Sequence, residues 1–149
     1  MSNTLEDTLS WFQTAIPEPD NKNIRSQFCA HLEEFNELLR EVHTTDHSLL
    51  TLITAASNNL SDIQNCLKQM TPPDFSFPDR QATLDAICDG LVTGTGLAHM
   101  LGMDVINGLN EVNRSNFSKF DEDGKPIFSE TGKIIKGKNY SPPNLDPYV

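Results

Sequence analysis

The stretch FCAHLEEFNELLREV, residues 28–42, decides the fold class because its apolar residues recur at helical spacing. Successive steps of four, three, four and three residues place these side chains on one helix face, which predicts a buried stripe. The stripe consists of Phe28, Leu32, Phe35, Leu39 and Val42. We therefore predict a long amphipathic helix over about residues 23–42.

Similar apolar spacing continues on both sides of this helix. Residues 5–16 form a predicted first helix, which Pro17 ends because proline cannot continue the backbone ladder. A third helix follows a cap at Thr45 or Asp46 and ends before the proline-rich residues 70–79. These segments predict helices joined by short, proline-containing connections.

Two further helices and a different C-terminal end complete the predicted architecture. The fourth helix begins near Asp79 and ends at Gly102, and the fifth begins at a cap on Asp104 and reaches about Phe120. The helical period is lost in residues 121–149.

Within that C-terminal end, the apolar residues 126–128 and 134–135 flank a glycine-containing turn at residues 129–132 and predict a small β-hairpin. The ending SPPNLDPYV predicts an extended tail. The expected fold is all-α, a bundle of four to five helices over about residues 5–120 with a C-terminal hairpin, in a single domain of residues 1–149.

Composition and charge exclude several classes of protein. A hydrophobic share of 37% is enough for a core, and the net charge of -10 argues against broad nucleic-acid binding, which needs a basic face. No stretch approaches the roughly 20 apolar residues of a membrane span, and the N-terminus has no signal-peptide pattern. Cys29, Cys66 and Cys88 form no CxxC pair, which indicates packing residues in a reducing compartment. We therefore expect a cytoplasmic protein without a membrane partner.

Two groups of carboxylates stand out in the predicted helices. Glu33, Glu34 and Glu37 form an EExxE pattern, whose side chains lie within an arc of roughly 100° beside the apolar stripe. On the fourth helix, Asp85 and Asp89 are spaced i, i+4 on one face among apolar residues. Taken singly, each group also fits a solvated helix face, a helix cap or an ion pair with arginine.

A shared position in one bundle would change the interpretation of these carboxylates. Two unit charges roughly 4 Å apart repel by about 4 kcal/mol at an effective dielectric near 20, and several such pairs exceed the stability of many small domains. Oxygen ligands on facing helices suit Mg²⁺ or Mn²⁺. The histidines form no HExxH motif for zinc, and the ExxH pairs of a di-iron bundle are absent.

Three features in this order resemble the all-α NTP pyrophosphatase superfamily, which includes MazG, dimeric dUTPases and phosphoribosyl-ATP pyrophosphatase. They are the EExxE motif, the later acid pair and the stretch EVNRSNFSKFDEDGKPIFSETGKIIKGKNYSPPNL, residues 111–145. That last stretch looks like the phosphoribosyl-ATP pyrophosphatase-like branch of phages and bacteria, which includes the dGTP-cleaving MazZ enzymes. The resemblance covers about residues 27–145.

The resemblance implies hydrolysis of a nucleoside triphosphate to its monophosphate and pyrophosphate, with two or three Mg²⁺ or Mn²⁺ ions and a metal-activated water that attacks the α-phosphorus. Glu34, at the edge of the acidic arc, is the expected general base. The superfamily's second motif is usually ExxD, whereas Ala86 lies three residues before Asp89, so the ligand role passes to Asp85. The expected metal ligands are Glu33, Glu34, Glu37, Asp85 and Asp89.

The C-terminal end is the basic part of an acidic chain. Six of the eleven basic residues lie in the last 36 positions, which predicts a cover for polyphosphate, with a solvated hairpin as the alternative. Asn113 and Asn116 are also explained by helix capping or packing, and Trp11 is also explained by a buried position on the first helix. The expected substrate-binding residues are Trp11, Asn113, Asn116, Lys119, Lys136, Lys138 and Tyr140.

The expected substrate is a purine dNTP, dGTP first. One alternative is a house-cleaning pyrophosphatase for dUTP or non-canonical NTPs, and another is a non-catalytic acidic helical interaction module. The small-residue stretch GTGLA, residues 94–98, and the amphipathic helices predict a homodimer or homotetramer. If the chain is phage-encoded, its expected location is the host cytoplasm.

Overall fold

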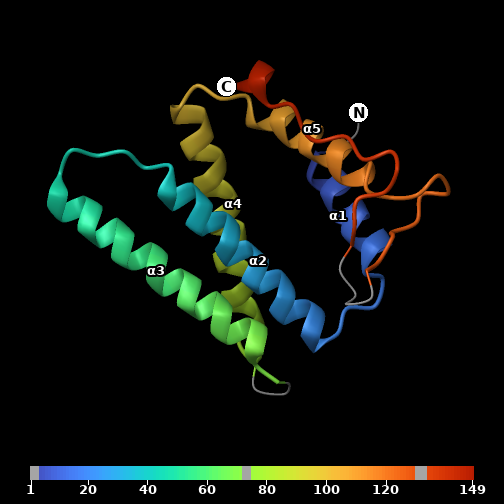
Figure 1. Cartoon of the computed structure of the whole chain (residues 1–149), viewed down its shortest axis with the longest axis horizontal. Coiled ribbons are helices and arrows are strands. Elements are labelled where there is room, and N and C mark those ends of the chain that lie inside the picture. Colours follow the sequence, from blue (N-terminus) through green and yellow to red (C-terminus); the bar gives the residue numbers. More distant parts are fainter. Residues whose placement is uncertain (1–3, 72–74, 130–133) are drawn as a thin grey trace. The chain divides into compact units, whose positions relative to one another are not determined.

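The computed structural model describes residues 4–71, 75–129 and 134–149, and in these ranges it contains five α-helices and one short 3₁₀ helix (Figure 1). The predicted all-α fold is therefore confirmed. The helices are α1 (Thr4–Ala15), α2 (Asn21–Arg40), α3 (His47–Gln69), α4 (Arg80–Met100) and α5 (Val105–Phe117), followed by η1 (Asp146–Tyr148). None of the helices in these ranges is long and apolar enough to cross a membrane.

The chain divides into two compact units. The first unit comprises Met1–Pro17 and Asp79–Val149, and the second comprises Glu18–Pro78. The first unit therefore contains α1, α4, α5 and η1, and the second contains α2 and α3. The single domain expected over residues 1–149 stays a prediction.

Aspartate side chains begin four of the five helices. Each accepts a hydrogen bond from a backbone N–H in the first turn, where these groups have no partner within the helix and the helix dipole favours negative charge. The predicted caps at Asp46 and Asp104 are confirmed, and Gly102 ends α4 at a φ of 76°, which favours glycine. The four caps are Asp20, Asp46, Asp79 and Asp104.

In the first unit, α1 and α5 pack side by side through a polar seam (Figure 1). The Thr4 hydroxyl donates to Asn110 Oδ1 at 2.8 Å, and the Thr8 hydroxyl donates to Asn113 Oδ1 at 2.9 Å. Asn113 Nδ2 in turn donates to the Thr4 carbonyl at 2.8 Å. Since later residues of α1 meet later residues of α5, the two helices are parallel, and no short loop can join them.

Aromatic rings close the C-terminal end of this seam. Trp11 Nε1 donates to the Asn116 carbonyl at 2.9 Å, and the Trp11 ring stacks on Phe120 with 5.7 Å between centroids. The Phe117 ring contacts the Phe120 ring in a T-shaped arrangement, with 5.9 Å between the two centroids. Phe120 is 4% exposed, so this aromatic cluster forms a buried apolar contact between α1 and the segment that ends α5.

In the second unit, α2 and α3 form an antiparallel pair with a polar interior (Figure 1). Asn36 Nδ2 donates to the Ser57 carbonyl and to Ser61 Oγ, both at 3.2 Å. Arg40 Nε donates to Ser57 Oγ at 2.9 Å, and the Cys29 thiol lies 3.8 Å from the Gln64 carbonyl. Serine, asparagine and cysteine therefore share the interface with apolar side chains such as the buried Leu67 and the half-buried Leu32 and Leu39.

This polar interior changes the predicted buried stripe of α2. Asn36 is 3% exposed, whereas Phe35 is 55% exposed and Val42 is 45% exposed. Asn36 takes the buried position in place of Phe35 because its amide donates to the Ser57 carbonyl and the Ser61 hydroxyl of α3. Phe28 keeps its expected role and packs against Phe75 and Phe77 at one end of the pair.

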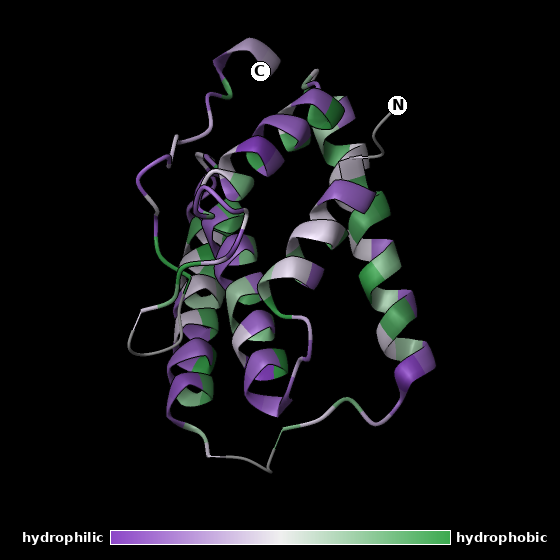
Figure 2. Ribbon diagram, turned by 90° about the vertical axis from the view of Figure 1, so that its right-hand side faces the viewer, coloured by the Kyte–Doolittle hydropathy of each residue, from purple (hydrophilic) through white to green (hydrophobic). Residues whose placement is uncertain are grey.

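Large apolar side chains remain exposed in both units. In Figure 2, hydrophobic and hydrophilic residues are interspersed along the helices. No residue of α4 is buried, and Val92 and Met100 are 70% and 84% exposed. Among the described residues, a methyl group added at Gly94 or Gly96 would meet no atom within 4 Å. Within its own unit, α4 therefore presents large apolar side chains at its surface.

The predicted C-terminal hairpin is not formed as a pair of strands in the described residues. A single antiparallel bridge joins Phe128 to Ile134, and Ile135 N donates to the Ile127 carbonyl at 2.8 Å. Most of the expected turn, residues 130–132, lies outside the described residues. Apolar pieces of two or three residues are too short for a ladder, because two-stranded sheets of this size are marginal in water.

A substitution of the buried Asn113 tests how much the α1–α5 seam contributes to stability. Replacing Asn113 with Ala removes its two hydrogen bonds across the seam and leaves the Thr8 hydroxyl bonded only to the Thr4 carbonyl of its own helix. We expect the free energy of unfolding to fall by about 1–3 kcal/mol, measured by urea denaturation. Gln13→Ala, an exposed change on α1, is the control. Equal midpoints for the two variants would contradict the importance of the seam.

Candidate functional site

The predicted metal ligands lie on two helices that belong to different units. Glu33, Glu34 and Glu37 are on α2, and Asp85 and Asp89 are on α4, and all five residues are exposed. In the part of the chain that the structure describes, no three His, Cys, Asp or Glu residues form a group that could hold a metal ion. The convergence of the two acidic faces therefore stays a prediction.

The three glutamates share one side of α2. Taking the buried Asn36 as the direction of α3, Glu33, Glu37 and Glu34 follow at roughly 60°, 100° and 160° around the helix. The glutamates therefore flank the interface with α3 and turn away from it. Glu34 lies farthest from α3, which gives it the freest access to solvent.

The arginines of α2 point away from this acidic side. Arg40 follows Glu37 by three residues, a spacing that allows an ion pair, yet its guanidinium donates to Ser57 and Ser61 of α3. Arg25 donates to the Met70 carbonyl. Among the described residues, no hydrogen bond or salt bridge engages the glutamate side chains of the EExxE motif. Their charge is left without compensation from the helix itself.

Three of the expected substrate residues lie together at the C-terminal end of α5. Lys119 Nζ donates to Asn116 Oδ1 at 2.8 Å and lies 5.9 Å from the centroid of the Trp11 ring. Because Phe120 already stacks on Trp11, that ring is partly occupied by the protein. Asn113 is 4% exposed and its amide is bonded to α1, a geometry that fits the packing alternative.

The other expected substrate residues lie on the segment that follows. Lys136 Nζ lies 4.4 Å from the centroid of the Tyr140 ring, a cation–π contact. Lys138 lines a hollow of about 300 Å³ together with Asn139. Its other lining residues are Phe120, Asp121, Glu122, Asp123 and Ile127. Among the described residues that line the hollow, three are acidic and Lys138 is basic.

Gly137, which was not among the predicted site residues, lies where the segment with Lys136 and Lys138 approaches the backbone of Lys119. A Cβ atom at this position would lie 3.0 Å from Ile127 Cδ1, 3.1 Å from the Lys119 carbonyl and 3.3 Å from the Phe120 carbonyl. Only a residue without a side chain allows this approach to the backbone. A glycine between two lysines, in KGK, was the signal in the sequence.

Comparison with known proteins assigns no family to this chain. No protein-family profile, curated protein or solved structure matches it.

The contact at Gly137 predicts a large effect for a small substitution. In Gly137→Ala, the methyl group meets two backbone carbonyls that cannot move aside, so the segment must shift off the end of α5. We expect a loss of about 1–3 kcal/mol in the free energy of unfolding, typical of overpacking, and amide chemical-shift changes at Lys119 and Phe120. Asn139→Ala is the matched control. Unchanged shifts at both residues would show that the close approach does not exist in solution.

Proposed function

We propose that this protein is a nucleoside triphosphate pyrophosphohydrolase that depends on Mg²⁺ or Mn²⁺. The observation that carries the proposal is the EExxE face of α2, where Glu33, Glu34 and Glu37 lie exposed and unpaired in the described structure while both arginines of the helix bond to α3 or its end. A face kept only for solubility would gain from a nearby cation at i, i+3 or i, i+4. An uncompensated face fits a bound metal better.

The donor set fits the proposed ions. Carboxylate oxygens on a rigid helix are the ligands that Mg²⁺ and Mn²⁺ prefer, and Asp85 and Asp89 present the same oxygen chemistry on α4. The proposal requires both faces to contribute to one site of two or three ions. When bound, these ions supply charge neutralisation of the triphosphate and a lower pKa for the attacking water.

The chain's own residues supply the remaining chemistry. Glu34, the most outward of the three glutamates, accepts the proton of the attacking water as general base. The basic residues around Gly137 bind the charge of the departing pyrophosphate, with Lys119 fixed by Asn116 and Lys136 fixed by the Tyr140 ring. Trp11 and Asn113 contribute through the seam that holds α5.

The substrate class follows from the resemblance of residues 111–145 to the phosphoribosyl-ATP pyrophosphatase-like branch. We take a purine dNTP, dGTP first, as the substrate, with dUTP or a non-canonical NTP as the runner-up and the cytoplasm as the site of action. An assay of pyrophosphate release across the eight common NTPs and dNTPs, with Mg²⁺ and with Mn²⁺, ranks these substrates.

A non-catalytic interaction module is the second candidate. The uncovered apolar faces and the unpaired acidic face of α2 favour it, because both are surfaces that a partner protein can bind. Calorimetric titration with Mn²⁺ separates the two candidates. The enzyme binds Mn²⁺ and loses binding in Glu37→Gln, whereas the interaction module binds no divalent ion at a defined stoichiometry.

The central test is the removal of single carboxylates. We expect Glu37→Gln and Asp89→Asn each to lower pyrophosphate release by at least roughly tenfold at saturating Mg²⁺, because a charged oxygen ligand is lost. The fold should remain, since both residues are exposed and unpaired in the described structure. Glu41→Gln, one turn after Glu37 and outside the motif, is the control. Retention of wild-type activity by Glu37→Gln would exclude the proposed site.

The exposed apolar faces support assembly into a homodimer or homotetramer. Leu84, Ile87 and Leu91 of α4 are each at least half exposed, and no residue of this helix is buried. Burying such side chains stabilises an assembly by about 25 cal/mol per Å² of apolar surface before the cost of association. We expect light scattering at micromolar concentration to give a multiple of 16.6 kDa. A mass of one chain would contradict the assembly.

A further inference from the structure

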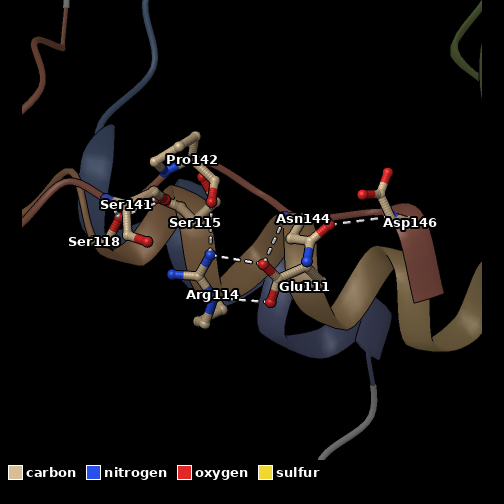
Figure 3. A network of polar contacts seen from close by, with 8 residues as sticks. All are labelled: Glu111, Arg114, Ser115, Ser118, Ser141, Pro142, Asn144 and Asp146. Atoms are coloured by element: carbon tan, nitrogen blue, oxygen red, sulfur yellow. Dashed lines mark hydrogen bonds and ion pairs between the residues drawn. The ribbon is translucent and has the colours of Figure 1, made fainter. Parts of the chain in front are cut away.

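The C-terminal tail lies along α5 and is held there by the side chains of Glu111 and Arg114 of that helix and of its C-cap residue Ser118 (Figure 3). Glu111 and Arg114 form a bidentate ion pair with N–O distances of 2.8 and 2.7 Å. The same two side chains also bind tail backbone: Glu111 Oε1 accepts from Asn144 N at 2.9 Å, and Arg114 Nη2 donates to the Pro142 carbonyl at 2.9 Å. The ion pair thus has a second function as an anchor.

Ser118 forms the next anchor point. Its hydroxyl accepts from Ser141 N at 2.9 Å and donates to the Ser115 carbonyl at 2.7 Å (Figure 3). The opposite end of the tail is tied to the start of α5, where Asp104 N donates to the Tyr148 carbonyl at 2.9 Å. The tail is therefore bonded to the N-cap residue, to the middle and to the C-cap residue of α5.

The anchor is adjacent to the basic segment. Ser141 directly follows Tyr140, whose N–H donates to the Gly137 carbonyl at 3.2 Å and whose ring lies under Lys136. Gly137 in turn lies against the Lys119 carbonyl. The short segment from Lys136 to Tyr140 is thus fixed at one end by glycine packing and at the other by the tail anchor.

We propose that Glu111, Arg114 and Ser118 are positioning residues that hold the basic segment, residues 136–140, against the C-terminal end of α5 by anchoring the tail. The consequence of this positioning for catalysis rests on the proposed function, whereas the anchoring of the tail does not depend on that function. An ordinary i, i+3 ion pair would stabilise α5 alone, and it would not require a carboxylate that accepts from Asn144 N or a guanidinium that donates to Pro142.

The pKa of Glu111 supports this geometry. The hydrogen bond from Arg114, followed by that from Asn144 N, lowers the pKa of Glu111 from 4.5 to about 2. A lowered folded-state pKa means that Glu111 contributes to anchoring above its ordinary value and loses that contribution as pH falls through about 2. The tail should therefore stay anchored at neutral pH and be released only in strong acid.

A charge exchange separates the anchor from the ion pair. In the double variant Glu111→Arg with Arg114→Glu, the i, i+3 pair persists, but the arginine introduced at position 111 offers no acceptor to Asn144 N. The glutamate introduced at position 114 likewise offers no donor to the Pro142 carbonyl. We expect hydrogen exchange at Ser141, Asn144 and Tyr140 in the full-length protein to become at least about fivefold faster.

Two further measurements complete the test. Ser118→Ala, which keeps the ion pair, should also speed exchange at Ser141 and Tyr140, and Glu122→Gln is the matched control with no expected change. In the wild type, the Asn144 amide shift should titrate with a midpoint near pH 2, and this titration should be absent in the double variant.

Unchanged exchange at Ser141 and Asn144 in the double variant would overturn the anchor. Faster exchange at these residues with Tyr140 unchanged would overturn the positioning role. Pyrophosphate release by the same variants is a separate readout, and we expect a higher KM for the triphosphate. A wild-type protein without pyrophosphate release would refute the proposed function and leave the exchange result valid.

Discussion

A buried asparagine amide holds each pair of helices in register, and the rest of the structure depends on this pairing. Asn36 bonds α2 to Ser57 and Ser61 of α3, and Asn113 bonds α5 to Thr4 and Thr8 of α1. A buried amide without a partner is costly, so each asparagine selects one alignment of its helices. Polar residues therefore occupy the middle of both interfaces, while aromatic rings pack at their ends and many other large apolar side chains stay exposed.

This arrangement connects the fold to the proposed activity. The side chains of Asn36 and Arg40 are occupied by α3, which leaves the glutamates of the same helix exposed and without a cation. Such a face is unfavourable by itself, because like charges on one helix side repel, and it becomes favourable when divalent ions bind. The exposed apolar faces are likewise unfavourable in a single chain, and association would stabilise them because it removes them from water.

The C-terminal end shows how a flexible-looking sequence acquires a defined position. Proline-rich residues at its end have few local hydrogen bonds to form, so their order comes from α5 through Glu111, Arg114 and Ser118. Gly137 completes the arrangement because the backbone of the basic segment can then touch the end of the helix. Cations spread along the sequence are in this way gathered near one helix terminus, where the helix dipole also favours positive charge.

The sequence by itself determined the all-α class, four to five helices, the cap at Asp104 and a cap at Thr45 or Asp46, because apolar periodicity and capping are local properties. It also showed the acidic arc on α2, which depends only on helical geometry. Only the tertiary structure decided that Asn36 is buried while Phe35 is exposed, that one bridge replaces the expected hairpin, and that Glu111 anchors the tail. These features depend on which side chains of a distant segment offer a partner, and helical periodicity contains no information about that choice.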